Sequence, residues 1–147
     1  MSDPKKVRSR DVIERQQPYS ILPKAQNGSP RWRFHFADTA YDQAWSWNKL
    51  GKKIGRLFTF MKEMEQLSWL AIMNMRGGKR GYHHFQPIDS LCKEAQERLC
   101  VLDLDDLDEL FRFRLGSGER LWGVKQQEDF FLLWWDPDHK VYLGEPR

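Results

Sequence analysis

The sequence predicts an α+β domain. Its small antiparallel β-sheet would be formed by an N-terminal strand and a C-terminal meander, with two main helices packed on one face. The first observation is that residues 110–143 contain the runs LFRFRL, ERLWGVK, FFLLWW and HKVYL, separated by GSG, QQED and DPD. Short apolar or alternating runs between turn residues are typical of a β-meander of three or four strands. The second observation is a helical spacing of apolar residues in two earlier segments.

The chain has 147 residues, which is the length of one domain. Residues 1–30 are polar, rich in proline and without sustained periodicity, so they are expected to form a flexible basic arm that precedes a single α+β domain over 31–147. Residues 1–33 contain eight Lys and Arg against three Asp and Glu, although the whole chain has a net charge of only +3. The arm could be a solvated tail or could contact phosphate or a partner, and the near-neutral body needs local basic patches to bind nucleic acid.

The domain is predicted to begin with a strand over 31–36, because RWRFHF alternates aromatic and polar residues and would place Trp32, Phe34 and Phe36 on one face. Residues 39–50 are expected to form a loop and a short helix. Apolar residues at spacings of three and four then predict a first main helix over about 54–75.

Glycines in RGGKRGYHH predict a flexible basic loop over 76–84. A second main helix is predicted to begin at a cap formed by Asp89 or Ser90 and to end near Leu102. An acidic connector, 103–109, then leads into the meander. The pattern therefore leaves one face of the sheet uncovered.

Several classes of protein are not predicted. No apolar run approaches the roughly 18 residues of a membrane helix, and no signal peptide opens the chain, so the expected location is cytoplasmic. Cys92 and Cys100 would lie about 12 Å apart on one helix, too far for a disulfide. Walker, GxGxxG and HExxH motifs do not occur, and the adjacent His83 and His84 would point to different sides of an extended chain, so neither a cofactor nor a metal site is predicted.

The basic residues along the meander suit metal-independent cleavage of RNA by its own 2′-hydroxyl. This reaction needs a general base, a general acid and cations around the phosphate. Arginine binds phosphate with two parallel hydrogen bonds, and His, Lys, Tyr or Glu can transfer protons. The candidate residues of these types are Arg114, Glu119, Arg120, His139, Lys140 and Tyr142.

The series of helix, acidic connector, FRFRLGSGERLWGVK, FFLLWW and HKVY resembles the C-terminal half of the RelE/ParE-like toxins. The resemblance implies a small α+β fold, a ribosome-dependent mRNA endonuclease and an antitoxin as the neutralising partner. It implies that Arg114 and Arg120 grip the phosphate and that His139 and Tyr142 transfer protons or stack on a base. The supporting RNA-binding residues would be Arg76, Lys79, Arg80, Arg112 and Lys140.

Two other functions agree with the same sequence. A non-catalytic protein interaction module or inhibitor would use exposed aromatic residues, such as one ring of Trp134 and Trp135, together with the acidic segment 103–109. A protein that binds nucleic acid without cleaving it would use the basic arm and the Gly-rich loop.

Overall fold

A computed structural model describes residues 28–76 and 82–144. It contains a five-stranded sheet in the order β1-β5-β4-β3-β2, with three α-helices, which confirms the α+β class. The strands are β1 (Arg31–Arg33), β2 (His84–Pro87), β3 (Glu109–Arg114), β4 (Arg120–Gln126) and β5 (Asp129–Asp136). The α-helices are α3 (Ile54–Met64), α4 (Trp69–Met73) and α5 (Lys93–Val101), and three short 3-10 helices are η2 (Trp47–Lys49), η3 (Gly51–Lys53) and η4 (Ile88–Ser90). Of the predicted N-terminal arm, residues 1–27 lie outside the described residues.

The meander predicted from the turn signals forms from β3, β4 and β5, which pair antiparallel in chain order. The fourth run, HKVYL, forms no strand. The carboxylate of Asp136 instead accepts the backbone N–H groups of Lys140 (2.8 Å) and Val141 (3.0 Å), which holds this segment as a loop against the end of β5. Backbone groups bound by a side chain are not available to a sheet.

The N-terminal strand is shorter than its alternating sequence predicts, and it pairs parallel with β5. A turn closed by a hydrogen bond from Ala37 N–H to the Phe34 carbonyl (3.0 Å) follows the strand directly. As a result, Trp32 and Phe36 pack into different clusters and Phe34 faces solvent, so the three aromatic rings do not share one buried face. The sheet is therefore mixed and not purely antiparallel.

Strand β2 lies in a region that the sequence assigned in part to a loop. It pairs antiparallel with β3, with His84 opposite Arg112 and Pro87 opposite Glu109. Pro87 ends the strand at the edge of the sheet, which is where a residue without a backbone N–H is tolerated.

The first main helix is interrupted. Helix α3 ends at Met64, and the hydroxyl of Ser68 accepts the Ala71 N–H (3.1 Å) to cap the separate helix α4. Serine is among the preferred N-cap residues because its oxygen satisfies a free N–H of the first turn. The second main helix begins later than predicted, with Cys92 as its N-cap, since residues 88–90 form the short helix η4.

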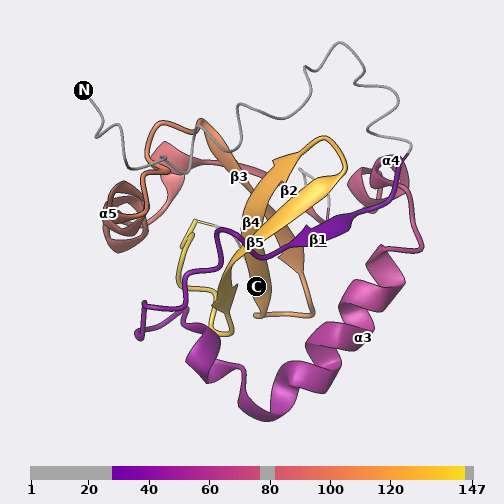
Figure 1. Cartoon of the computed structure of the whole chain (residues 1–147), viewed down its shortest axis with the longest axis horizontal. Coiled ribbons are helices and arrows are strands. Elements are labelled where there is room, and N and C mark those ends of the chain that lie inside the picture. Colours follow the sequence, from indigo (N-terminus) through magenta and orange to yellow (C-terminus); the bar gives the residue numbers. More distant parts are fainter. Residues whose placement is uncertain (1–27, 77–81, 145–147) are drawn as a thin grey trace.

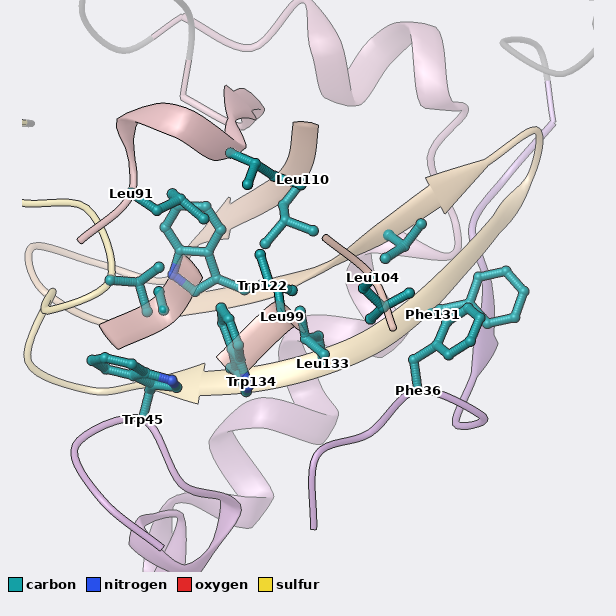
Figure 2. Close-up of a cluster of buried hydrophobic side chains, with 14 of the residues drawn as sticks. Phe36, Trp45, Leu91, Leu99, Leu104, Leu110, Trp122, Phe131, Leu133 and Trp134 are labelled. Carbon is teal, nitrogen blue, oxygen red and sulfur yellow. The ribbon is translucent and has the colours of Figure 1, made fainter. Parts of the chain in front are cut away.

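The helices cover both faces of the sheet, whereas the sequence placed them on one (Figure 1). We call the side that packs against Ala95 and Leu99 of helix α5 the α5 face, and Figure 2 shows part of its core around Trp122 and Trp134. We call the other side the α3/α4 face. Its core joins α3 and α4 to Phe111, Phe113, Phe130 and Trp135 of the sheet.

A β-bulge determines which of the two adjacent tryptophans lies on which face of the sheet. Trp122 of β4 lies opposite Trp134, but the next residue, Gly123, lies opposite Leu132, so Leu133 is the extra residue of β5. Trp134 therefore packs on the α5 face and Trp135 on the α3/α4 face, as expected, but both rings are fully buried. Neither tryptophan offers the exposed surface that the interaction hypothesis needed.

Candidate functional site

Two of the predicted phosphate-binding arginines are buried and bind the protein's own backbone. Arg120 donates to the carbonyls of Gly116 (3.2 Å), Ser117 (3.3 Å) and Glu119 (3.1 Å), so it holds the β3–β4 turn. Arg112 donates to the Tyr82 carbonyl (3.1 Å) and contacts His84 Nε2. Because both side chains are buried and donate to backbone carbonyls, these arginines do not form the open basic sheet face that the ribonuclease hypothesis predicts.

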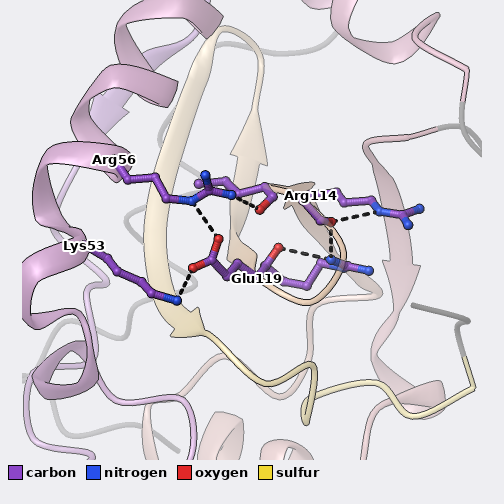
Figure 3. A network of polar contacts seen from close by, with 7 residues as sticks. Lys53, Arg56, Arg114 and Glu119 are labelled. Carbon is purple, nitrogen blue, oxygen red and sulfur yellow. Dashed lines mark hydrogen bonds and ion pairs between the residues drawn. The ribbon is translucent and has the colours of Figure 1, made fainter.

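Glu119, predicted as a general base, lies in a network of two cations. Its carboxylate accepts Lys53 Nζ at 2.6 Å and Arg56 Nε at 2.7 Å, both from the start of α3 (Figure 3). Arg56 also donates to the Leu115 carbonyl at 2.6 Å. The network ties α3 to the β3–β4 turn.

The predicted C-terminal residues lie in the loop after β5. His139 is buried and has a positive φ of 61°, and Tyr142 packs at the edge of the α5-face core. Lys140 and the more distant Arg76 are exposed, whereas Lys79 and Arg80 lie outside the described residues. Neither His139 nor Tyr142 lines the pocket that contains Arg114.

Arg114, one of the predicted catalytic residues, lines a pocket. Its Nε donates to the Gly116 carbonyl at 3.2 Å, and its guanidinium lies 4.9 Å from the centre of the Tyr82 ring. In the described part of the chain, the two terminal nitrogens of this guanidinium have no recorded hydrogen bond or ion pair. Alternation along β3 places Arg112 and Arg114 opposite Phe111 and Phe113, as the sequence predicted.

We call this cavity the Arg114 pocket. It has a volume of about 510 Å³ and lies between α3, the β3–β4 turn and the start of β2. Its polar lining residues are Arg56, Thr59, Glu63, Tyr82, His83 and Arg114, and its apolar lining residues include Phe60, Met64, Met75 and Leu115. The size of this pocket is typical of a site for a small molecule or for one unit of a larger ligand, and its lining has more polar side chains than is usual for such a site.

His83 contributes a buried hydrogen-bond donor to the pocket. Its Nδ1 lies 3.0 Å from the backbone N of Arg114, so Nδ1 accepts that N–H and the neutral ring carries its proton on Nε2. The side chain is 1% exposed, and its Nε2 has no hydrogen-bond partner among the described residues. Burial, followed by the charge of Arg112, lowers the pKa of His83 to about 3. The ring is therefore neutral at physiological pH and offers an unused N–H.

The sequence did not identify most residues of this pocket. It considered His83 only together with His84, for which no metal site was predicted, and it placed Arg56 and Glu63 on a helix without a role. The spacing of Lys53 and Arg56, three residues apart, was a usable signal because it puts both cations on one side of a helix. The pairing of that helix with the β3–β4 turn could not be read from the spacing.

The described residues contain no group of three or more His, Cys, Asp or Glu that could hold a metal ion. In the same ranges, 28–76 and 82–144, every helix is too short or too polar to span a bilayer. A scan against protein-family models found no match, and searches of the curated proteins and of the solved structures found no significant match.

Proposed function

We propose that this protein binds RNA in the Arg114 pocket and cleaves it without a metal ion, as a toxin-type endoribonuclease. One observation carries the proposal: Arg114, whose terminal guanidinium nitrogens bind no described residue, and His83, whose buried Nε2–H has no described partner, line the same pocket. A buried donor without a partner costs about 1–3 kcal/mol, and an acceptor oxygen of a ligand would remove that cost.

The pocket has suitable groups for a phosphodiester. Arg114 would bind the non-bridging oxygens with two hydrogen bonds, and the Nε2–H of neutral His83 would donate to one of them. Arg56 adds a second positive charge at the pocket wall, although one edge of its guanidinium is held by Glu119. The rings of Phe60 and Tyr82 offer surfaces on which a base could stack.

Cleavage would use the remaining polar residues. The Glu63 carboxylate would take the proton of the 2′-hydroxyl while the 2′-oxygen attacks phosphorus. The bond from phosphorus to O5′ would break, and O5′ would take a proton from the Tyr82 hydroxyl, which solvent then restores. The products are a 2′,3′-cyclic phosphate and a 5′-hydroxyl. His83 keeps its proton throughout because its pKa is about 3, so it acts as a donor and not as a base.

The test measures binding and cleavage of a short RNA by the full chain in the presence of EDTA. We expect Arg114→Ala to weaken binding and cleavage at least about tenfold, because charged hydrogen bonds to phosphate contribute more than neutral ones. Glu63→Gln should bind RNA but lose cleavage. Lys93→Ala, which removes an exposed cation from α5, is the matched control and should change neither. An RNA with a 2′-deoxy sugar at the cleavage position should bind without being cut.

The outcomes of these measurements distinguish a ribonuclease from a protein that only binds nucleic acid. Binding without cleavage by the wild type would identify a nucleic-acid-binding protein, and equal binding by Arg114→Ala would overturn the assignment of the pocket. In cells, induced wild type should arrest growth and degrade mRNA, whereas Arg114→Ala should do neither while remaining folded. The antitoxin and the ribosome stay part of this proposal as partners, and the same induction beside a neutralising protein would test the first of them.

A second candidate function, recruitment or inhibition of another protein, is favoured by one observation. Phe34 and Phe58 are 65% and 55% exposed beside an apolar groove. The exposed aromatic surface thus lies near α3 and not at Trp134 and Trp135. Growth arrest with intact mRNA that survives Arg114→Ala would support this second function.

A further inference from the structure

A second cavity lies on the α3/α4 face beside the start of the sheet. It is a groove of about 220 Å³ between the turn after β1, helix η2 and helix α3. Its floor is made by Leu57, Met61 and Leu132, and its walls include Phe34, Trp47 and Phe58. The described lining residues contain no charged side chain. We call this cavity the Phe34–Phe58 groove.

Exposed apolar side chains extend the groove along α3. Ile54 is 48% exposed and lies one turn before Phe58, on the same side of the helix. Together with Phe34, these residues form an apolar ridge beside the apolar floor of the groove. Large exposed apolar residues that gather at one place, unlike scattered ones, mark an interaction site.

Basic residues surround the groove. Lys49 and Lys52 are exposed in the segment that leads into α3, next to Leu50 of the groove wall, and Lys62 is exposed one turn beyond Phe58. No ion pair of these three lysines is recorded among the described residues, whereas Lys53 pairs with Glu119. We call these three lysines, which precede and follow the α3 residues of the groove along the chain, the lysine rim.

We propose that the Phe34–Phe58 groove binds an amphipathic α-helix of another protein, with apolar residues on one face and acidic residues beside them. The apolar face of such a helix would cover Phe34, Ile54 and Phe58, and its carboxylates would meet the lysine rim. The spacing of Ile54 and Phe58, one helical turn, matches the spacing of side chains on an opposing helix.

Charge excludes two other occupants. The N-terminal part of this chain, residues 1–33, carries eight Lys and Arg against three Asp and Glu, so the lysine rim repels it. A second copy bound through the same surface would place Lys49, Lys52 and Lys62 of the two copies near one another. A two-fold contact is made by the same patch on both copies, and like charges in it are unfavourable.

The test uses the full chain and a fluorescent synthetic helix of about 16 residues, with Leu at positions a and d and Glu at the flanking positions. Anisotropy should report binding of this acidic peptide and much weaker binding of the same peptide with Lys in place of Glu. Phe58→Ser and Phe34→Ser should each weaken binding about tenfold. The pair Lys49→Glu with Lys62→Glu should weaken it several-fold and remove most of its salt dependence.

Val101→Ser is the matched control, because Val101 is 68% exposed at the end of α5, outside the groove, and this change should leave binding unaltered. Circular dichroism of each variant would establish that the fold is kept, as expected for exposed positions. Equal affinity for the Lys-containing peptide, or unchanged affinity in both Phe variants, would overturn the proposal. So would self-association that is lost in Phe58→Ser, or tighter binding of a synthetic peptide of residues 1–27 than of the acidic probe.

Discussion

The two faces of the sheet differ in the side chains that form their cores. On the α5 face, Asp38 binds both Arg98 and the Nε1–H of Trp134, and Asp136 accepts the Nε1–H of Trp122. The Nε1–H of Trp45, on the same face, has no hydrogen-bond partner among the described residues. The α3/α4 face is built from aromatic rings in edge and tilted contact, such as Phe113 with Phe130 at 4.9 Å. The indole N–H groups of Trp32 and Trp135 on this face have no hydrogen-bond partner among the described residues, whereas those of Trp47 and Trp69 donate to backbone carbonyls.

Burial shifts the pKa of titratable groups on both faces of the sheet. Burial is the main cause that lowers the pKa of His83 to about 3 and that of Lys125 to about 8. On the α5 face, burial raises the pKa of Asp136, but the hydrogen bonds from Lys140 and Val141 act in the opposite direction. The Arg114 pocket and the Phe34–Phe58 groove both open beside α3. The comparison shows that both cavities open beside α3, whereas the buried carboxylates Asp38 and Asp136 bind their partners on the α5 face.

The largest expected effect is at Asp38, which is 2% exposed. Its carboxylate accepts Arg98 Nε (2.8 Å), a terminal nitrogen of Arg98 (2.7 Å) and Trp134 Nε1 (2.9 Å). Asp38→Ala should lower the free energy of unfolding by about 3–5 kcal/mol, because it leaves a mostly buried guanidinium without its partner. Urea unfolding at neutral pH would measure the loss.

Asp105→Ala removes an exposed carboxylate near the same face and should change stability by less than about 0.5 kcal/mol. If Asp38→Ala lowers the free energy of unfolding as little as Asp105→Ala does, the paired charges of the α5 face contribute little to stability. The two faces would then not differ in this respect.

Gly123 lies in β4 at the β-bulge, and its substitution should have the next largest effect on the free energy of unfolding. A Cβ atom there would lie far inside contact distance of the Phe131 carbonyl oxygen and the Phe130 ring. Gly123→Ala should therefore cost about 3 kcal/mol, because backbone atoms cannot move aside cheaply. The matched control is Gly118→Ala, whose added Cβ would meet the Pro137 carbonyl at an ordinary 3.6 Å. Equal melting temperatures of the two variants would show that the close packing around Gly123 at the bulge does not contribute to the stability of the sheet.

The sequence predicted the elements whose signal is local. Turn residues and apolar runs located β3, β4 and β5, and apolar spacing located α3 and α5. It did not predict the parallel pairing of Arg31–Arg33 with β5, since partners 98 residues apart leave no local pattern. The run FFLLWW is apolar throughout, so neither the bulge at Leu133 nor the sides of Trp134 and Trp135 could be derived from alternation alone.

The candidate site was predictable only in part for a similar reason. Alternation correctly placed Arg112 and Arg114 on one face of β3, but it could not show that the core of the α5 face covers Arg112 and leaves Arg114 in a pocket. The sequence considered His83 only together with His84, for which no metal site was predicted. Its role as a neutral donor depends on the Arg114 N–H, a contact made through the pairing of β2 with β3.

His83 tests how the α3/α4 face responds to acid. Its pKa falls from an ordinary 6.5 to about 3 on folding, so the unfolded chain binds more protons between these values. Its contribution to stability is complete above pH 6.5 and declines as the pH falls toward 3. Between pH 7 and pH 5 the wild type should lose about 2 kcal/mol more than His83→Asn, which keeps an acceptor for Arg114 N–H but cannot titrate.

The measurement is urea unfolding of both proteins at the two pH values. Equal acid sensitivity in wild type and His83→Asn would mean that the histidine is charged when folded, and the pocket would then contain a cation in place of a neutral donor.

Substitution of Lys125 should have the smallest effect on stability. It tests whether the α3/α4 face stabilises a buried positive charge. The Lys125 ammonium donates to the Gln127 carbonyl (2.8 Å) and lies 4.8 Å from the centre of the Trp69 ring. Because burial lowers its pKa from 10.5 to about 8, the unfolded chain binds more protons between these values, and stability should rise with pH across this window. Lys125→Met keeps the packing on Trp69 and removes the buried charge, so its stability relative to wild type should be higher at pH 7 than at pH 10 by about 1 kcal/mol after solvent screening. A difference that stays constant with pH would show that the contact with Trp69 supports the charged form, and the α3/α4 face would then accommodate a cation as well as the α5 face does.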